Sequence, residues 1–190
     1  MYDETQKKIM DAAMNLILEH GYPGTTTKDI AKKAGVNEST IFRRFKGKKE
    51  IVLTAIQRNE WFPDIKKEDF ADYTNNMQED LKRFSRIYTS KVTPKMVKIS
   101  IGLRSPDLYP DTAEEILKVP TVFKDSMEQY FKYLYDNGRI SRNDFEHMAM
   151  MFLSLNFGFV FMISSFERNI TAIDLEDYIT HSIEIFTQGL

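Results

Sequence analysis

Residues 26–45 read TTKDIAKKAGVNESTIFRRF, and this stretch decides the fold of the N-terminal part of the chain. The pattern predicts two short helices, over about 27–33 and 38–45, separated by a glycine-containing turn. Two helices that cross so closely need small residues at their contact. The stretch supplies Ala31, Ala34 and Gly35 there. It therefore predicts a helix-turn-helix unit.

Both short helices carry sequence signals for their first turn. Thr26 lies three residues before Asp29, an arrangement similar to a capping box, in which the first side chain accepts a backbone hydrogen bond from the third helical residue. Asn37 can cap the second helix in the same way. These signals fix where each helix begins.

The second short helix is predicted to face a ligand, because short hydroxyls and arginines lie on its outward side. The major groove of DNA just admits a helix, short side chains let the helix approach base edges, and arginine pairs with guanine or phosphate. We therefore predict DNA binding; the alternative is a packing corner with solvated arginines. The outward residues are Glu38, Ser39, Thr40, Arg43 and Arg44.

Charge is distributed unevenly along the chain. The 190 residues carry 26 Lys+Arg and 28 Asp+Glu, a net charge of −2. Residues 1–58 contain 11 basic and 7 acidic residues, which leaves 15 basic and 21 acidic for the rest. This asymmetry favours a polyanionic partner for the N-terminal part alone. The isoelectric point near 6.0 disfavours a non-specific architectural DNA-binding protein, which would depend on phosphate neutralisation.

Composition excludes several kinds of chemistry. The chain has no cysteine, so disulfides, thiol catalysis and zinc–thiolate sites are excluded, and its three histidines are scattered. It contains no Gly-rich phosphate loop, His-Glu-x-x-His motif or nucleophile elbow. We therefore expect no metal, no cofactor and no enzymatic activity. The alternative is a small-molecule-binding enzyme or ligand carrier with a helical core and no recognisable catalytic motif.

The remaining periodicity is helical throughout, and no alternating strand pattern persists. Trp61–Asp64 marks a boundary, which predicts domains at 1–59, linked through a fourth helix at about 48–59, and at 60–190. The sequence thus predicts an all-α fold of about nine helices. Beyond the helices already named, the first is expected at about 4–19, and the later ones at 69–91, 94–103, 112–117, 120–136, 143–166 and 174–188.

The N-terminal stretch 9–58 resembles the DNA-binding domain of TetR-family transcriptional regulators. The residues that carry the resemblance are Ile9, Ala12, Ala13, Leu16, His20, Gly21, Tyr22, Thr25, Thr26, Asp29, Ile30, Ala31, Ala34, Gly35, Val36, Thr40, Ile41, Phe42, Phe45, Lys48, Lys49, Glu50 and Ile51. The resemblance covers about a quarter of the chain. It implies a cytoplasmic, dimeric, ligand-responsive regulator, most often a repressor, bound to a pseudo-palindromic DNA operator.

The resemblance implies roles for individual residues. Thr27 and Lys48 stand where the family contacts phosphate. Two positions depart from the family: its usual tyrosine is Phe42 here, which lacks the hydroxyl, and its usual histidine is Arg44, which could replace that contact with a charged one. The full set of expected DNA-binding residues is Thr27, Lys28, Asn37, Ser39, Thr40, Phe42, Arg43, Arg44, Lys46 and Lys48.

The resemblance also implies a homodimer formed through the last two helices, with the two DNA-binding heads about 34 Å apart. The segment 143–166 is apolar nearly all round, so one domain face cannot easily cover it, whereas a four-helix interface would. The expected interface residues are Phe157, Phe161, Tyr178, Ile179, Ser182, Ile183 and Phe186.

A small-molecule effector is expected to bind among the aromatic and methionine residues of the C-terminal part. Such side chains suit bulky apolar or aromatic cationic ligands, although they can equally be core. Asn156 is a polar amide in an apolar segment and needs a partner, which could be the ligand, the dimer mate or a backbone carbonyl. The candidates are Phe84, Tyr88, Phe123, Met127, Tyr130, Phe152, Asn156 and Phe159.

The same apolar segment raises the question of a membrane span. Twenty residues between Glu146 and Glu167 carry no Asp, Glu, Lys or Arg, which is about the length that crosses a bilayer. Interspersed polar residues and acidic flanks favour a buried helix instead. We therefore expect this helix to lie in a core or an oligomer interface, buried on most of its circumference, and expect no contact with a membrane.

Overall fold

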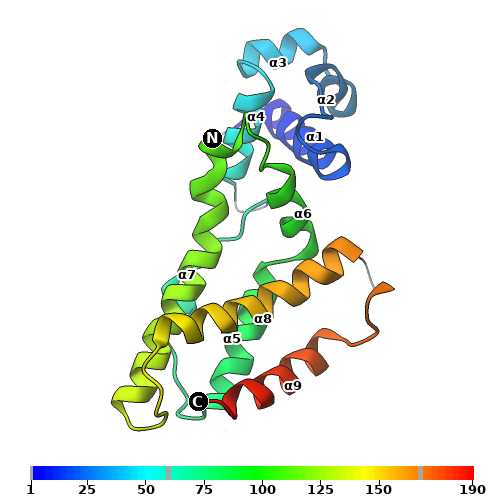
Figure 1. The fold of residues 1–190 in the computed structure, drawn as a ribbon. Coiled ribbons are helices and arrows are strands. Elements are labelled where there is room, and N and C mark those ends of the chain that lie inside the picture. Colours follow the sequence, from blue (N-terminus) through cyan, green and yellow to red (C-terminus); the bar gives the residue numbers. More distant parts are fainter. Residues whose placement is uncertain (1, 59–60, 167–168) are drawn as a thin grey trace. The chain divides into compact units, whose positions relative to one another are not determined.

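A computed structural model of the chain describes residues 2–58, 61–166 and 169–190. These residues form nine α-helices and one 3-10 helix, with no strand among them, which confirms the all-α prediction. Figure 1 shows their course along the chain. The elements are α1 (Glu4–His20), α2 (Thr27–Ala34), α3 (Glu38–Arg44), α4 (Lys48–Ile56), η1 (Lys67–Phe70), α5 (Met77–Lys91), α6 (Pro94–Gly102), α7 (Tyr109–Asp136), α8 (Phe145–Phe166) and α9 (Leu175–Thr187).

The chain divides into two compact units, and their boundaries differ from a single cut near residue 60. Unit 1 combines residues 1–63 with 95–117, and unit 2 combines 64–94 with 118–190. The second segment of unit 1 joins the first because α6 approaches α1 closely. A Cβ at Gly102 would lie 3.3 Å from Ile17 Cγ2, a contact tighter than most, which shows how closely the two helices approach.

Two helical boundaries differ from the predicted ones. The segment 69–91 is not one helix, because the chain leaves the helical conformation after η1, and Asn76 begins α5 by accepting a hydrogen bond from the Glu79 N–H. The break predicted before Pro120 is absent, and α7 continues through it. The apolar stripe is in register on both sides of the proline, so burial offsets the lost backbone hydrogen bond. That stripe is Ile116, Val119, Phe123, Met127, Tyr130 and Leu134.

The core of unit 2 is a cluster of aromatic rings between η1, α5, α7 and α8. Phe123 is central, with ring centroids 5.2 Å from Phe70, 4.3 Å from Tyr88 and 5.8 Å from Phe152. All four side chains are buried. Such edge-on, tilted and stacked pairs add to the free energy of burial.

Helix α8 is the one described helix that is long and apolar enough to cross a membrane by length and composition. Only 28% of its most apolar window is buried within the chain. This is less than the sequence predicts, which is burial on most of the helix circumference. One side of α8 packs into the core of unit 2, and its other residues are half-buried or exposed among the described parts of the chain. The described part of the chain therefore leaves much of an apolar helix for another molecule to cover.

Candidate nucleic-acid interface and the α8–α9 face

Helices α2 and α3 form the predicted helix-turn-helix. Gly35 follows α2 in the left-handed conformation, with φ at +69°, where any other residue would be strained. The next N–H, from Val36, donates to the Ala31 carbonyl oxygen at 3.0 Å, which closes the turn. Thr26 caps α2 as predicted, because its Oγ1 accepts the Asp29 N–H at 3.1 Å. Asn37 occupies the N-cap position of α3, but its side chain makes no capping hydrogen bond.

Helix α3 has one buried side and one free side. Ile41 and the following Phe45 are buried in unit 1, which fixes the rotation of α3 about its axis. Ser39 and Arg43 are exposed on the other side, and Phe42 keeps 56% of its surface exposed. These exposed side chains combine a hydroxyl, a cation and an aromatic ring on one short helix. The free side of α3 is therefore the candidate surface for a DNA base edge or backbone.

Thr27 and Glu38 are joined across the turn. The Thr27 hydroxyl, at the first position of α2, donates a hydrogen bond of 2.6 Å to Glu38 Oε1, at the first position of α3. Glu38 is exposed, in keeping with its predicted place on the outward side of this helix, although it is absent from the expected DNA-binding residues. Its eleven-residue separation from Thr27 gives no sequence signal of this pairing. Lys28, beside Thr27, is exposed.

Lys48 is positioned differently from the other predicted cations. Its ammonium donates 2.6 Å hydrogen bonds to the carbonyl oxygens of Tyr22 and Thr25 and lies 4.0 Å from the centroid of the Tyr22 ring. Burial lowers the pKa of Lys48 below its usual range. Two of the three ammonium donors are thus used inside unit 1, and the N-terminus of α4 presents the Lys48 backbone N–H as well.

The exposed cations around α3 fall into two groups. Arg44 forms an ion pair of 2.9 Å with Asp3, the N-cap residue of α1. Lys28, Arg43 and Lys46 are exposed and, among the residues that the structure describes, form no ion pair. Their positive charge is therefore available to phosphate without competition from a carboxylate.

The predicted effector residues lie together in unit 2, but most of them fill its core. Phe84, Phe123, Met127 and Tyr130 have no exposed surface, and the Asn156 amide donates to the Phe152 carbonyl oxygen at 2.8 Å. Of the three partners considered for Asn156, the structure therefore contains the backbone carbonyl. Tyr88 and Phe152 are also buried in this core. Of the predicted set, Phe159 lines two pockets formed by described residues.

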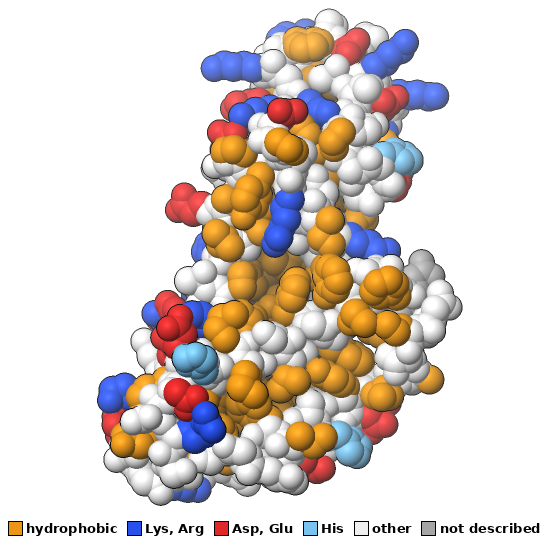
Figure 2. All heavy atoms as spheres, viewed as in Figure 1, with side chains coloured by type: hydrophobic (Ala, Val, Ile, Leu, Met, Phe, Trp, Pro, Cys, Tyr) orange, Lys and Arg blue, Asp and Glu red, His pale blue; other side chains and the backbone are white. Residues whose placement is uncertain are grey.

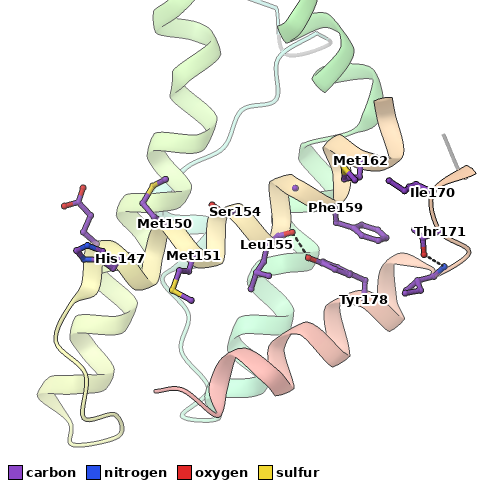
Figure 3. A pocket seen from close by; sticks show the side chains of 13 residues that line it. His147, Met150, Met151, Ser154, Leu155, Phe159, Met162, Ile170, Thr171 and Tyr178 are labelled. Carbon is purple, nitrogen blue, oxygen red and sulfur yellow. Dashed lines mark hydrogen bonds between the residues drawn. The ribbon is translucent and has the colours of Figure 1, made fainter. Parts of the chain in front are cut away.

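Two of these pockets meet at Phe159. A groove of about 960 Å³ runs between α8 and the chain before and within α9, and a smaller pocket of about 180 Å³ lies between α5, α8 and Leu175. Figure 3 shows Phe159 beside Tyr178, whose ring is stacked on it at 4.1 Å and whose hydroxyl donates to the Leu155 carbonyl oxygen at 2.9 Å. The apolar side chains of the groove are Met150, Met151, Leu155, Phe159, Met162, Ile170, Ile173 and Tyr178.

The predicted dimer residues divide between core and surface. Ile179, Ile183 and Phe186 are buried within unit 2, because α9 packs this stripe on α5. This is a correction: the stripe that the sequence shows is the inner one. Phe157 is exposed, and Phe161, Tyr178 and Ser182 are half-buried. Figure 2 shows hydrophobic side chains gathered over α8 and α9 on this face. The exposed ones missed by the sequence prediction are Met150, Met151, Met162, Phe166, Ile170, Ile173, Leu175 and Ile185.

A metal centre finds no support in the described ranges, where no group of three or more His, Asp or Glu side chains could hold an ion. The sites of interest are therefore the free side of α3 and the α8–α9 face.

Comparisons with known proteins match the N-terminal helices to a family of regulators and the whole chain to individual relatives. A sequence profile described as "Bacterial regulatory proteins, tetR family" matches residues 9–55, which span α1 to α4. The chain is 29% identical to the HTH-type transcriptional regulator YvkB of Bacillus subtilis (strain 168), over 98% of this chain and 97% of that protein. It is 26% identical to IcaR of Staphylococcus epidermidis, a negative regulator of the biofilm operon icaADBC, over 77% and 78% of the two chains.

The fold of the whole chain is also similar to solved structures. The crystal structure of FadR from Bacillus subtilis in complex with stearoyl-CoA matches with a TM-score of 0.66 at 21% identity, over 97% of this chain and 98% of that one. At this identity the likeness concerns the fold alone.

Proposed function

The chain belongs to the TetR family of bacterial regulatory proteins and is a helix-turn-helix transcriptional regulator; we propose that it acts in the cytoplasm as a homodimeric repressor that an apolar effector releases from its operator. The observation that carries this proposal is α3. It is held by Ile41 on one side and presents Phe42 and Arg43 on the other, and the nearby Lys28 and Lys46 form no ion pair with a described carboxylate.

The proposed DNA contacts follow from these side chains. Arg43 can pair with guanine or with phosphate, and Ser39 is short enough to let α3 approach base edges. Phe42 can meet a thymine methyl group through its exposed ring. Lys28 and Lys46 supply charge for phosphate neutralisation, which sets the salt dependence of binding. A pseudo-palindromic operator would then present one half-site to each copy.

A second copy of the chain is the proposed partner of the α8–α9 face. No charged side chain is found on α8 after Glu146, and large apolar residues are exposed on both helices. An exposed apolar surface of this kind marks an interface, and a second copy would meet it with the same apolar residues. The groove of about 960 Å³ would then be filled by side chains of the partner.

The effector is proposed to bind unit 2 beside Phe159. The smaller pocket is apolar, but its volume of about 180 Å³ is below the roughly 300–1,000 Å³ of drug-sized sites. Because Phe159 lines both pockets, a change of its rotamer would enlarge the smaller one. FadR, which shares the fold, has been crystallised with stearoyl-CoA, and a long apolar chain is the class of effector that we propose here. It would act by binding more tightly to the conformation of the regulator that has the lower affinity for DNA.

Fluorescence anisotropy tests the proposed function. Duplexes from the DNA flanking the gene would be compared with a scrambled duplex over a salt series. We expect a preference of about a thousandfold or more for one flank, eroded by Arg43→Ala. Lys28→Ala should weaken both duplexes alike and lower the salt slope by about one. Equal affinity for every duplex, after refolding to remove bound effector, would contradict the proposal.

A further inference from the structure

Glu38 is the one carboxylate on the described residues of α3, and it stands on the side that we assign to DNA. It is exposed, and no cation of the described chain forms an ion pair with it. Its Oε1 accepts the 2.6 Å hydrogen bond from the Thr27 hydroxyl, and Oε2 has no such partner in this part of the chain. One oxygen of this exposed carboxylate is thus held by Thr27, while the other accepts no hydrogen bond from the described chain.

A carboxylate in this place is unfavourable for binding DNA in general. It repels phosphate, and when ionised it can only accept hydrogen bonds. In the major groove, the donors that it can meet are the amino groups of cytosine N4 and adenine N6. Adenine also presents the N7 acceptor beside N6, and this acceptor would repel the negatively charged carboxylate next to it. Cytosine presents a donor with no such acceptor, so it is the base that a carboxylate fits.

We propose that Glu38 is a specificity-determining residue that reads a cytosine amino group in each operator half-site, and that Thr27 is the positioning residue that holds its carboxylate. The inference rests on the proposed function. It also gives Thr27 a role that differs from a phosphate contact, because its hydroxyl proton is already donated to Glu38. Glu38 lowers the affinity for DNA of any sequence, and this lower affinity is then the means by which wrong sequences are rejected.

The two roles for Thr27 affect different duplexes. A phosphate contact contributes to every sequence equally and to the salt slope. A hydroxyl that orients Glu38 contributes only where the cytosine is present. Thr27→Val removes the hydroxyl and keeps the shape of the side chain, while Thr27→Ser keeps the hydroxyl, so this pair of variants separates the two roles.

The experiment is a selection from a randomised duplex pool with the full-length protein, followed by anisotropy on the selected site and on its single-base variants. We expect the wild type to enrich cytosine at one position of each half-site. Glu38→Ala should lower discrimination there by about 5- to 100-fold, while binding a scrambled duplex more tightly. Glu38→Gln should move the preference to adenine, whose N6 and N7 an amide can pair with. Thr27→Val should lower discrimination at the same position only, and Thr27→Ser should restore it.

Glu50→Gln is the matched control, because Glu50 is an exposed glutamate of unit 1 on α4. It removes one negative charge and should leave the base preference unchanged. If Glu38→Ala selects the same base at every position as the wild type, the inference is wrong although the proposed function stands. If Thr27→Val weakens all duplexes equally, the positioning role is wrong. If the wild type itself selects no sequence, the proposed function fails, and this inference with it.

Discussion

Lys48 and Tyr22 are joined twice in unit 1: the ammonium donates a 2.6 Å hydrogen bond to the Tyr22 carbonyl oxygen and lies 4.0 Å from the centroid of the Tyr22 ring. The same ammonium donates to the Thr25 carbonyl oxygen. It thereby ties the first turn of α4 to the loop between α1 and α2. The family resemblance implies a phosphate contact at Lys48, and this geometry adds a structural role to that expectation.

Lys48→Met should therefore lower stability as well as DNA affinity. Methionine keeps an unbranched apolar stem, but both carbonyl oxygens lose a charged donor, which costs about 1–3 kcal/mol for partly buried groups. Urea denaturation of the full chain measures this loss. Lys46→Met is the control, since Lys46 is exposed and, in the described part of the chain, unpaired. It should weaken DNA binding with stability unchanged, and equal stability loss in both variants would refute the structural role.

The Arg44–Asp3 ion pair predicts that removing an acidic residue improves DNA binding. Asp3→Asn frees the guanidinium of Arg44, while asparagine caps α1 about as well as aspartate does. Affinity for any duplex should rise several-fold at low salt, and the salt slope should steepen by up to about one phosphate contact. Titrations over a salt series measure both quantities.

A double-mutant cycle tests whether this gain passes through Arg44. In an Arg44→Ala background, Asp3→Asn should have a smaller effect on affinity, since the cation that it frees is absent. The same gain in both backgrounds would show that Asp3 acts on DNA directly through its charge.

Gly24 is predicted to be intolerant of substitution. A Cβ at this position would lie 2.5 Å from the His20 carbonyl oxygen, which is backbone and cannot move aside cheaply. Gly24→Ala should destabilise unit 1 by about 1–3 kcal/mol and lower the thermal midpoint of the protein. In Gly189→Ala the new Cβ would lie 3.7 Å from the Phe186 carbonyl oxygen, an ordinary contact, and the midpoint should stay within error. A wild-type midpoint in Gly24→Ala would show that this loop adjusts.

The helix-turn-helix could be predicted from sequence because its signals are local. Gly35 and the Thr26 cap act within a few residues, and the structure contains both as expected. Asn75 and Asn76, which end the chain segment before α5, carry an equally local signal that the longer apolar periodicity concealed. The break before α5 and the continuation of α7 through Pro120 differ from the prediction for one reason: tertiary packing decides whether apolar periodicity or a single turn residue determines the local structure.

The roles of the apolar stripes could not be predicted, because periodicity shows that a helix has an apolar side without showing what covers it. Helix α9 has two such sides: Ile179 and Ile183 face the core, and Ile185 is 71% exposed. The Thr27–Glu38 hydrogen bond likewise could not be predicted from the sequence, since it depends on how two helices cross.

The outer sides of α8 and α9 are predicted to hold the dimer together. Met151 and Ile185 keep 60% and 71% of their surface exposed, so aspartate at either position should leave the fold of the chain intact. In the dimer the same substitution would bury a charge without a partner, which costs several kcal/mol. Sedimentation analysis should show a dimer for the wild type and monomers for Met151→Asp and Ile185→Asp. Leu117→Asp, at a 49% exposed position in unit 1, should remain dimeric.

Tyr130 is predicted to stabilise unit 2 through one buried hydrogen bond. Its hydroxyl donates to Asp80 Oδ2 at 3.0 Å, while Thr74 supplies two donors to Oδ1, and Asp80 itself is buried. Tyr130→Phe keeps the ring in the aromatic cluster and leaves one carboxylate oxygen without a donor, so unfolding should become easier by about 1–3 kcal/mol. In Asp80→Asn the charge is gone, and adding Tyr130→Phe to that variant should cost less. Chemical denaturation of the wild type and the three variants measures this coupling, and additive losses would show that the two side chains act independently.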